Sequence, residues 1–254
     1  MLYLPGGADA AELAIVIDDV GYHQLRGMRA IALPGPVTIA VLPHAPHTNR
    51  LVNQALHAGK DVIVHQPMQA ELSRQAPREK DTLMLDMQQQ DFASVAAAAL
   101  DAVPGRIGLS NHTGSLLTAH RAPMRQLMTL LAERDLFFLD SRTTAATVAL
   151  EVAREHGVPA IKRDVFLDHD AAPYAVHLAF ERALQIARRN GRAVLIGHPY
   201  EVSLNYLERR LQNLPADIRL VSVAELASRQ RSITRPAMLA QPPRLVTPRI
   251  SPVP

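Results

Sequence analysis

Short apolar runs that alternate with amphipathic stretches constrain the fold of this chain more than any other feature. Eight such runs occur, over Leu13–Asp18, Val37–Leu42, Asp61–His65, Arg106–Ser110, Leu136–Asp140, Pro159–Arg163, Ala193–Gly197 and Ile218–Ser222. Most are rich in valine and isoleucine, and they show no clean alternation of apolar and polar residues. Strands that are buried on both faces give this pattern, so we expect a parallel sheet.

The stretches between these runs have helical periodicity and end near glycine or proline. In Arg121–Arg134, for example, four apolar residues recur at the spacing of one helix face, and a glycine follows the stretch Tyr174–Asn190. Strands that alternate with helices predict one α/β domain with right-handed crossovers. The alternation alone fits an open sheet or a barrel. No GxGxxG motif follows the first run, which disfavours a nucleotide-binding sheet.

We expect this domain to span residues 13–228, after an N-terminal extension of residues 1–12 and before a tail of residues 229–254. The tail holds six prolines and no helical or strand period, so we expect it to be disordered. It also holds five arginines and no acid, whereas the whole chain has a formal net charge of +3. The body is therefore slightly acidic, and we expect no nucleic-acid partner.

Absent residue types exclude further classes of protein. The chain has no cysteine, which rules out disulfides, thiolate metal sites and cysteine nucleophiles. No run of about 18 apolar residues is present, so we expect no transmembrane segment. Met1–Glu12 is neither basic nor apolar enough to be a visible signal peptide.

Polar residues end almost every predicted strand. They are Asp18 and Asp19, His44, His65, Asn111 and His112, Asp140 and Ser141, Asp164 and Asp168, and His198. In a parallel α/β fold these ends lie on one rim, where ligands bind. Imidazole and carboxylate groups gathered there suit a divalent metal with acid–base partners around it.

Each of these residues also has a purely structural interpretation. A single histidine at a strand end is more often a hydrogen-bonding residue than a metal ligand. Asp18 or Asp19 could cap a following helix, where aspartate is common. Two adjacent carboxylates directly after an apolar strand are costly to bury unless they are paired or bind a metal, so a cap explains only one of them.

Eight short motifs in order resemble the divergent polysaccharide deacetylase family of the NodB-type superfamily. They are IDDVG, VLPHAPH, VIVHQPM, SNHTGS, FFLDSRT, IKRDVFLD, ARRNG and IGHP, and they cover about residues 13–226. The resemblance implies a distorted parallel (β/α) barrel of about seven strands. It also implies a metal-dependent hydrolase that removes acetyl groups from carbohydrates by means of metal-activated water.

The resemblance implies a metal site built from three strand ends. Asp19 in IDDVG resembles the metal-binding carboxylate, and His65 in VIVHQPM resembles the first metal-binding histidine. The wider superfamily places its second histidine four residues further on, but Gln69 occupies that position here. His112 in SNHTGS is therefore the best candidate for the second histidine. This ligand set suits one zinc ion, although other first-row divalent metals fit similar ligands.

The resemblance also implies the catalytic residues. Asp18 resembles the catalytic base, His198 in IGHP the general acid, and Asp140 in FFLDSRT an acid that orients or tunes the site. The superfamily's Arg-x-Pro-Tyr segment, which steadies the base, has no counterpart here. The side chain of Asn111 or a backbone N–H of the 113–115 turn is our hypothesis for the oxyanion donor.

Other functions remain open at this point. The chain could be a non-catalytic relative that binds a glycan or peptidoglycan, or a metal-dependent amidase that acts on a non-carbohydrate amide. A structural role of the Pro/Arg tail is a further alternative. Relatives are usually exported, which implies the bacterial periplasm or cell envelope, and a carbohydrate or peptidoglycan-like substrate. The sequence does not indicate an oligomeric state.

Overall fold

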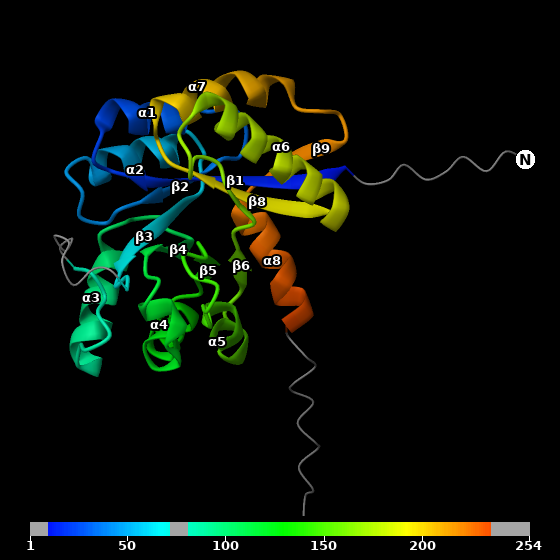
Figure 1. Ribbon diagram of the computed structural model, residues 1–254. Helices are drawn as coiled ribbons and strands as arrows, with labels where there is room; N and C mark the ends of the chain where they lie inside the picture. The colour runs from blue at the N-terminus through cyan, green and yellow to red at the C-terminus, as the bar shows by residue number, and fades with distance from the viewer. Residues whose placement is uncertain (1–9, 72–80, 235–254) are drawn as a thin grey trace, which may run out of the picture.

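A curved sheet of parallel strands lies at the centre of the computed structural model, which describes residues 10–71 and 81–234 (Figure 1). The strands are β1 (Ala11–Val20), β2 (Thr38–Val41), β3 (Val62–Met68), β4 (Gly108–Thr113), β5 (Phe137–Asp140), β6 (Ala160–Lys162), β7 (Val165–Phe166), β8 (Arg192–Gly197) and β9 (Ile218–Val221). The helices between them are α1 (Gln24–Ala32), α2 (Thr48–His57), α3 (Gln89–Asp101), α4 (Arg121–Glu133), α5 (Ala149–Glu155), α6 (Pro173–Asn190), α7 (Glu201–Arg210) and α8 (Val223–Thr234). Two short 3-10 helices, η1 (Leu117–Ala119) and η2 (Leu211–Asn213), complete the order.

The order of the strands shows that the sheet is a distorted barrel. Strands follow the order β6-β5-β4-β3-β2-β1-β8-β7, all neighbours are parallel, and β9 pairs with the start of β1. β6 and β7 lie at opposite ends of this order, although only Arg163 and Asp164 separate them in the chain. The sheet therefore curls round and leaves a seam between β6 and β8 that no strand ladder closes. The predicted α/β barrel is confirmed, and the two-residue strand β7 is too short to appear as an apolar run.

The strands are buried on both faces, as the unbroken apolar runs predict. Leu13, Ile15 and Ile17 of β1 pack in a large cluster with the surrounding helices. Ala14 and Val16 point the other way, into a smaller cluster inside the barrel that includes residues of α8. Successive side chains of a strand point to opposite faces, so both faces of β1 must be apolar.

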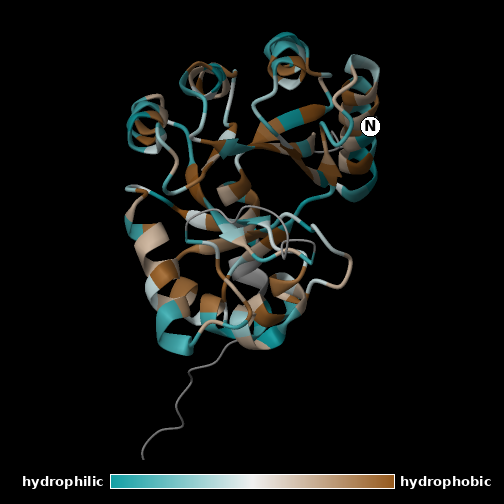
Figure 2. Ribbon diagram, turned by 60° about the vertical axis from the view of Figure 1, so that its left-hand side comes forward, coloured by the Kyte–Doolittle hydropathy of each residue, from teal (hydrophilic) through white to brown (hydrophobic). Residues whose placement is uncertain are grey.

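Helices α1 to α7 cover the outside of the sheet with their apolar faces. Figure 2 shows this amphipathic character, because hydrophobic segments gather toward the sheet and hydrophilic ones toward solvent. In α4 the predicted stripe is buried, from Met124 to Leu131. No helix in the described part of the chain combines the length and the apolar character needed to cross a bilayer.

The last helix begins before the predicted end of the domain and continues past it. α8 runs from Val223 to Thr234, whereas the tail was expected to begin at residue 229. Residues 229–234 are therefore helical, and the predicted domain bounds stay a prediction. Arg229 forms ion pairs with Glu12 of β1, 2.7 Å, and with Glu225, 2.6 Å, which lies one helical turn earlier in α8. Residues 1–9 and 235–254 lie outside the described residues.

Gly21, directly after β1, needs a backbone that other residues avoid. Its φ is +143°, and a Cβ there would lie 2.6 Å from the Cβ of Ala45 and 2.8 Å from Oγ1 of Thr48. We expect Gly21→Ala to lower the free energy of unfolding by about 3 kcal/mol, measured by urea denaturation. Gly59→Ala is the matched control, because φ is +68° there but no atom lies within 4 Å. If both variants lost the same free energy of unfolding, the contacts of Gly21 with Ala45 and Thr48 would not explain the effect.

Candidate metal centre

Strand ends of the barrel bring five of the predicted site residues together. Asp18 and Asp19 lie near the end of β1, His65 in β3, His112 in β4 and His198 directly after β8. These strands are near neighbours in the sheet, and their carboxyl ends share one rim because the strands are parallel. The rim predicted from the strand ends is therefore present.

An irregularity in β1 allows both aspartates to face the same histidine. In a regular strand, adjacent side chains point to opposite faces. Here the pairing of β1 with β2 shifts register between Ile17 and Val20, and Asp19 has a left-handed backbone with φ of 56°. As a result, Oδ2 of Asp18 lies 3.5 Å and Oδ1 of Asp19 lies 3.3 Å from Nε2 of His65. Bulges commonly redirect side chains next to active sites in this way.

Asp19, His65 and His112 form a cluster of the size that one metal ion needs. One potential ligand atom of each lies within 4.8 Å of the other two. Oδ1 of Asp19 is 2.8 Å from Nδ1 of His112, and the two imidazole rings are 5.0 Å apart at 71°. Two imidazoles and one carboxylate are a common protein ligand set for a catalytic divalent metal, with a position left for water.

The polar atoms of this cluster fit a metal better than they fit a hydrogen-bonded network. Oδ1 of Asp19 is buried and has no hydrogen-bond partner of acceptable geometry among the described residues, although two ring nitrogens converge on it. Nδ1 of His65 is hydrogen-bonded to Oγ of Ser110 at 2.7 Å, which directs Nε2 toward Asp19. Metal-binding histidines usually have such a partner on the second ring nitrogen.

Burial and neighbouring charges shift the pKa values of Asp18 and Asp19 in opposite directions. Burial raises the pKa of Asp18, against the attraction of His65. Burial opposes the ionisation of Asp19 as well, but the imidazoles of His112 and His65 outweigh it and hold the pKa of Asp19 well below its usual range. Adjacent carboxyl groups with divergent pKa values are typical of sites that assign them different chemical tasks.

His198 is held in place by Asp168, which lies two residues after β7. Oδ1 of Asp168 is 2.8 Å from Nδ1 of His198, and Oδ2 accepts hydrogen bonds from the backbone N–H of His198 at 2.7 Å and from Ser203 at 2.6 Å. Nε2 of His198 lies 3.8 Å from Oδ2 of Asp19. Burial alone would lower the pKa of His198, but Asp168 and the nearby Asp19 outweigh it and raise the pKa to about 9.

Asp140 is not part of the cluster that could hold a metal, and its orienting role stays a prediction. Its two carboxylate oxygens accept hydrogen bonds from the backbone N–H of Arg142, 2.8 Å, and from Thr147, 3.0 Å. Asp168 follows β7, and β7 is the neighbour of β8 in the sheet. Asp168 therefore holds His198, and its position after a strand end was the only signal for it in the sequence.

Two other strand-end residues have structural partners. The side chain of Asn111 donates to the carbonyl of Thr113 at 2.7 Å and accepts from the N–H of Ser141 at 2.9 Å. Asn111 is fully buried in this role, so the structure does not support the hypothesis that it is an oxyanion donor. His44 forms an ion pair with Asp81 at 3.3 Å and is not part of the cluster that could hold a metal.

The contact between Ser110 and His65 gives a first prediction for the site. We expect Ser110→Ala to weaken binding of a divalent metal by about 10- to 100-fold, because the imidazole of His65 loses the partner that fixes its orientation. Competition with a chromogenic chelator measures this affinity. Ser94→Ala on α3, where the hydroxyl contacts only its own helix, is the matched control and leaves the affinity unchanged. Equal affinities in the two variants would contradict the orienting contact.

Comparisons with known proteins show the family and the fold of this chain. The model of the divergent polysaccharide deacetylase family matches residues 15–227. The YibQ protein of Escherichia coli (strain K12) is 38% identical over 226 residues, which cover 89% of this chain and 70% of YibQ. Among solved structures, protein ATU2773 of Agrobacterium tumefaciens C58 has a TM-score of 0.83 at 22% identity, with 87% of this chain and 91% of that chain covered. The catalytic domain of a peptidoglycan N-acetylglucosamine deacetylase from Eubacterium rectale ATCC 33656 has a TM-score of 0.53 at 16% identity, over 87% and 90% of the two chains.

Proposed function

Because this chain belongs to the divergent polysaccharide deacetylase family, we propose that it is a metal-dependent hydrolase that removes acetyl groups from a carbohydrate of the bacterial envelope. The observation that carries the proposal is the cluster of Asp19, His65 and His112 with a second carboxylate and a third imidazole beside it. A protein that only binds glycans has no need of Asp18 and His198 at these positions. The fold similarity to a peptidoglycan deacetylase supports a polymer of N-acetylated sugars as the substrate class.

Asp19, His65 and His112 would hold the metal, for which zinc is our first choice. When bound, such an ion polarises the acetyl carbonyl and lowers the pKa of water toward about 7. The remaining steps belong to side chains of this chain. They are the binding of the acetyl group at the rim, the removal of a proton from water, and the delivery of a proton to the leaving group.

Asp18 is suited to accept the proton of the attacking water. Its Oδ1 is buried and has no hydrogen-bond partner among the described residues, so it is available for this contact. Burial raises the pKa of Asp18 and thereby makes the carboxylate a stronger base than an exposed aspartate. Attack of the water oxygen on the acetyl carbon gives a tetrahedral intermediate, and Asp18 then carries the proton.

His198 is suited to protonate the leaving group. Asp168 binds Nδ1, which leaves Nε2 to face the centre near Oδ2 of Asp19. With a pKa of about 9 the imidazole is protonated at neutral pH. When the bond between the acetyl carbon and the sugar nitrogen or oxygen breaks, Nε2 donates its proton to that atom. The products are acetate and a free amino or hydroxyl group.

The test is acetate release from N-acetylglucosamine oligomers and from peptidoglycan fragments by the purified chain. We expect hydrolysis that stops after chelation and returns when zinc or cobalt is added. An N-acetylated peptide of similar size is the control for an amidase that does not require a sugar. Undiminished hydrolysis after complete removal of metal would refute the mechanism. Binding of the oligomers without acetate release would refute catalysis.

A further inference from the structure

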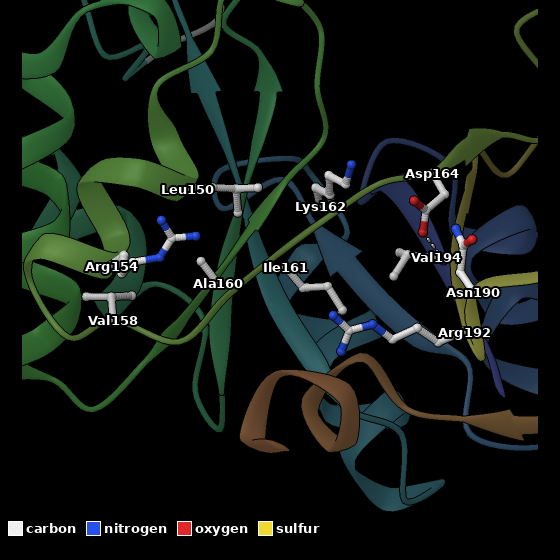
Figure 3. A pocket seen from close by; sticks show the side chains of 10 residues that line it. All are labelled: Leu150, Arg154, Val158, Ala160, Ile161, Lys162, Asp164, Asn190, Arg192 and Val194. Carbon is white, nitrogen blue, oxygen red and sulfur yellow. Dashed lines mark hydrogen bonds between the residues drawn. The ribbon is translucent and has the colours of Figure 1, made fainter. Parts of the chain in front are cut away.

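The pocket in the seam of the barrel does not extend the metal centre. It has a volume of about 370 Å³, and the charged side chains of Arg154, Lys162 and Arg192 in its lining point in different directions (Figure 3). Arg192 is the first residue of β8, whereas His198 follows the last residue, so the two lie at opposite ends of this strand. Contacts with a substrate held at the metal centre therefore come from the rim and not from this pocket.

An exposed aromatic ring, that of Tyr200, lies beside His198 at the rim. The centroids of the two rings are 5.4 Å apart, with 28° between the ring planes, and Tyr200 is 43% exposed. Burial and the carboxylates of Asp168 and Asp19 raise the pKa of the Tyr200 hydroxyl, so both charges lie close enough to act on it. The side chain of Tyr200 therefore borders the metal centre.

A second ring, that of Phe166, also stacks on His198, but other side chains already cover it. Its centroid lies 5.9 Å from that of the His198 imidazole. The guanidinium carbon of Arg163 is 3.6 Å from the centroid of the Phe166 ring, and Phe166 packs against the cluster inside the barrel. The hydroxyl of Tyr200, by contrast, forms no hydrogen bond with a described residue. Packing of the fold thus accounts for Phe166 but not for the exposed ring of Tyr200.

The backbone holds Tyr200 firmly in place. Its N–H donates to the carbonyl of His198 at 2.8 Å, and its carbonyl accepts the N–H of Leu204 at 2.9 Å where α7 begins. α7 is joined to α1 by the ion pair of Glu208 with Arg29, 2.8 Å. A rigidly held tyrosine loses little conformational entropy when a ligand covers its ring.

His198 and Tyr200 are placed to contact the same part of a substrate. In the proposed mechanism, Nε2 of His198 protonates the atom that the acetyl group leaves. In an N-acetylated sugar this nitrogen is bonded to a ring carbon, so the sugar ring lies next to the imidazole and within reach of Tyr200. A pyranose presents a face of C–H groups that packs well on an aromatic ring, whereas an acetylated peptide amine has no such face.

We propose that Tyr200 is the surface on which the pyranose that carries the acetyl group stacks, and that this contact makes the site specific for a sugar. The inference rests on the proposed function, because it takes His198 as the proton donor to the sugar nitrogen. The contact contributes to binding of the sugar and does not take part in proton transfer.

The experiment is calorimetric titration of the chelator-treated chain with the tetramer of N-acetylglucosamine, so that no acetate is released during the measurement. We expect a dissociation constant of about 1 mM or below. We expect Tyr200→Ala and Tyr200→Leu to weaken binding about tenfold, and Tyr200→Phe to stay within about twofold of the wild type, because only phenylalanine retains the aromatic ring. Circular dichroism checks that the variants are folded.

The matched control is Tyr174→Ala, which removes a tyrosine that is 71% exposed on α6, and we expect it to retain wild-type affinity. Absence of binding to the wild type, wild-type affinity in Tyr200→Ala, or an equal loss in Tyr200→Phe overturns the proposal. Equally tight binding of an N-acetylated peptide of similar size overturns the specificity for a sugar. Binding that depends on the Tyr200 ring, without acetate release by the zinc-loaded chain, supports the stacking contact and refutes the proposed catalysis.

Discussion

Asp18→Asn abolishes acetate release, on the proposed mechanism, and leaves metal binding intact. The amide has nearly the same shape as the carboxylate but cannot accept a proton, so we expect kcat to fall by about 10²- to 10⁴-fold. The carboxyl of Asp18 is not needed to hold the ion, because Asp19, His65 and His112 form the cluster without it. Steady-state kinetics on an acetylated oligomer and metal analysis of the same preparation measure the two effects separately.

Asp18→Asn has an expected effect on stability as well. Asp18 is 1% exposed and burial raises its pKa, so the charged carboxylate costs folding free energy. We expect the neutral amide to raise the free energy of unfolding by about 1 kcal/mol, as is common when a catalytic group that destabilises the fold is replaced. Asp86→Asn, at an exposed loop position, is the control and changes neither property. Wild-type kcat in Asp18→Asn would contradict its assignment as the base.

Asp168→Ala has the second large expected effect, on both stability and catalysis. Three hydrogen-bond donors lose their acceptor in this variant, namely Nδ1 and the N–H of His198 and the hydroxyl of Ser203. Because Asp168 is buried, we expect the free energy of unfolding to fall by about 3 to 5 kcal/mol. Thermal denaturation measures this loss.

The pH profile distinguishes a positioning role of Asp168 from a merely structural one. Asp168 raises the pKa of His198 to about 9, and the protonated imidazole is the form that donates to the leaving group. Without Asp168 the pKa falls toward its ordinary value, so the alkaline limb of kcat moves to lower pH. Ser203→Ala removes one contact to the same carboxylate and is the control, since the pair of Asp168 and His198 remains. An unmoved alkaline limb in a folded Asp168→Ala or Asp168→Asn variant would contradict the assignment.

The rim of the barrel could be predicted from the sequence because topology alone determines it. Parallel strands with helical crossovers place all carboxyl ends on one side, whatever the detailed packing. His65 and His112 follow this rule, since β3 and β4 are neighbours and Pro67 pairs with His112 in the ladder. The prediction that these strands are parallel was therefore enough to place His65 and His112 on the same rim.

The partner of His198 could not be predicted in the same way, because it depends on which strand pairs with β8 next to the seam. Asp140 and Asp168 both follow strand ends, and the sequence does not show which of them lies next to β8. The answer depends on β7, a strand of two residues that leaves no recognisable pattern. Likewise, the bulge that turns Asp19 toward His65 has no sequence signal beyond the pair of adjacent aspartates.

The central claim is that Asp19, His65 and His112 bind one divalent ion, and metal titration of the chelator-treated chain tests it most directly. We expect about one equivalent of zinc to bind the wild type and His44→Ala, a rim histidine outside the cluster. We expect His112→Ala and Asp19→Ala to lose this binding while they remain folded by circular dichroism. Wild-type zinc affinity in both variants, or no zinc bound by the wild type, would contradict the account.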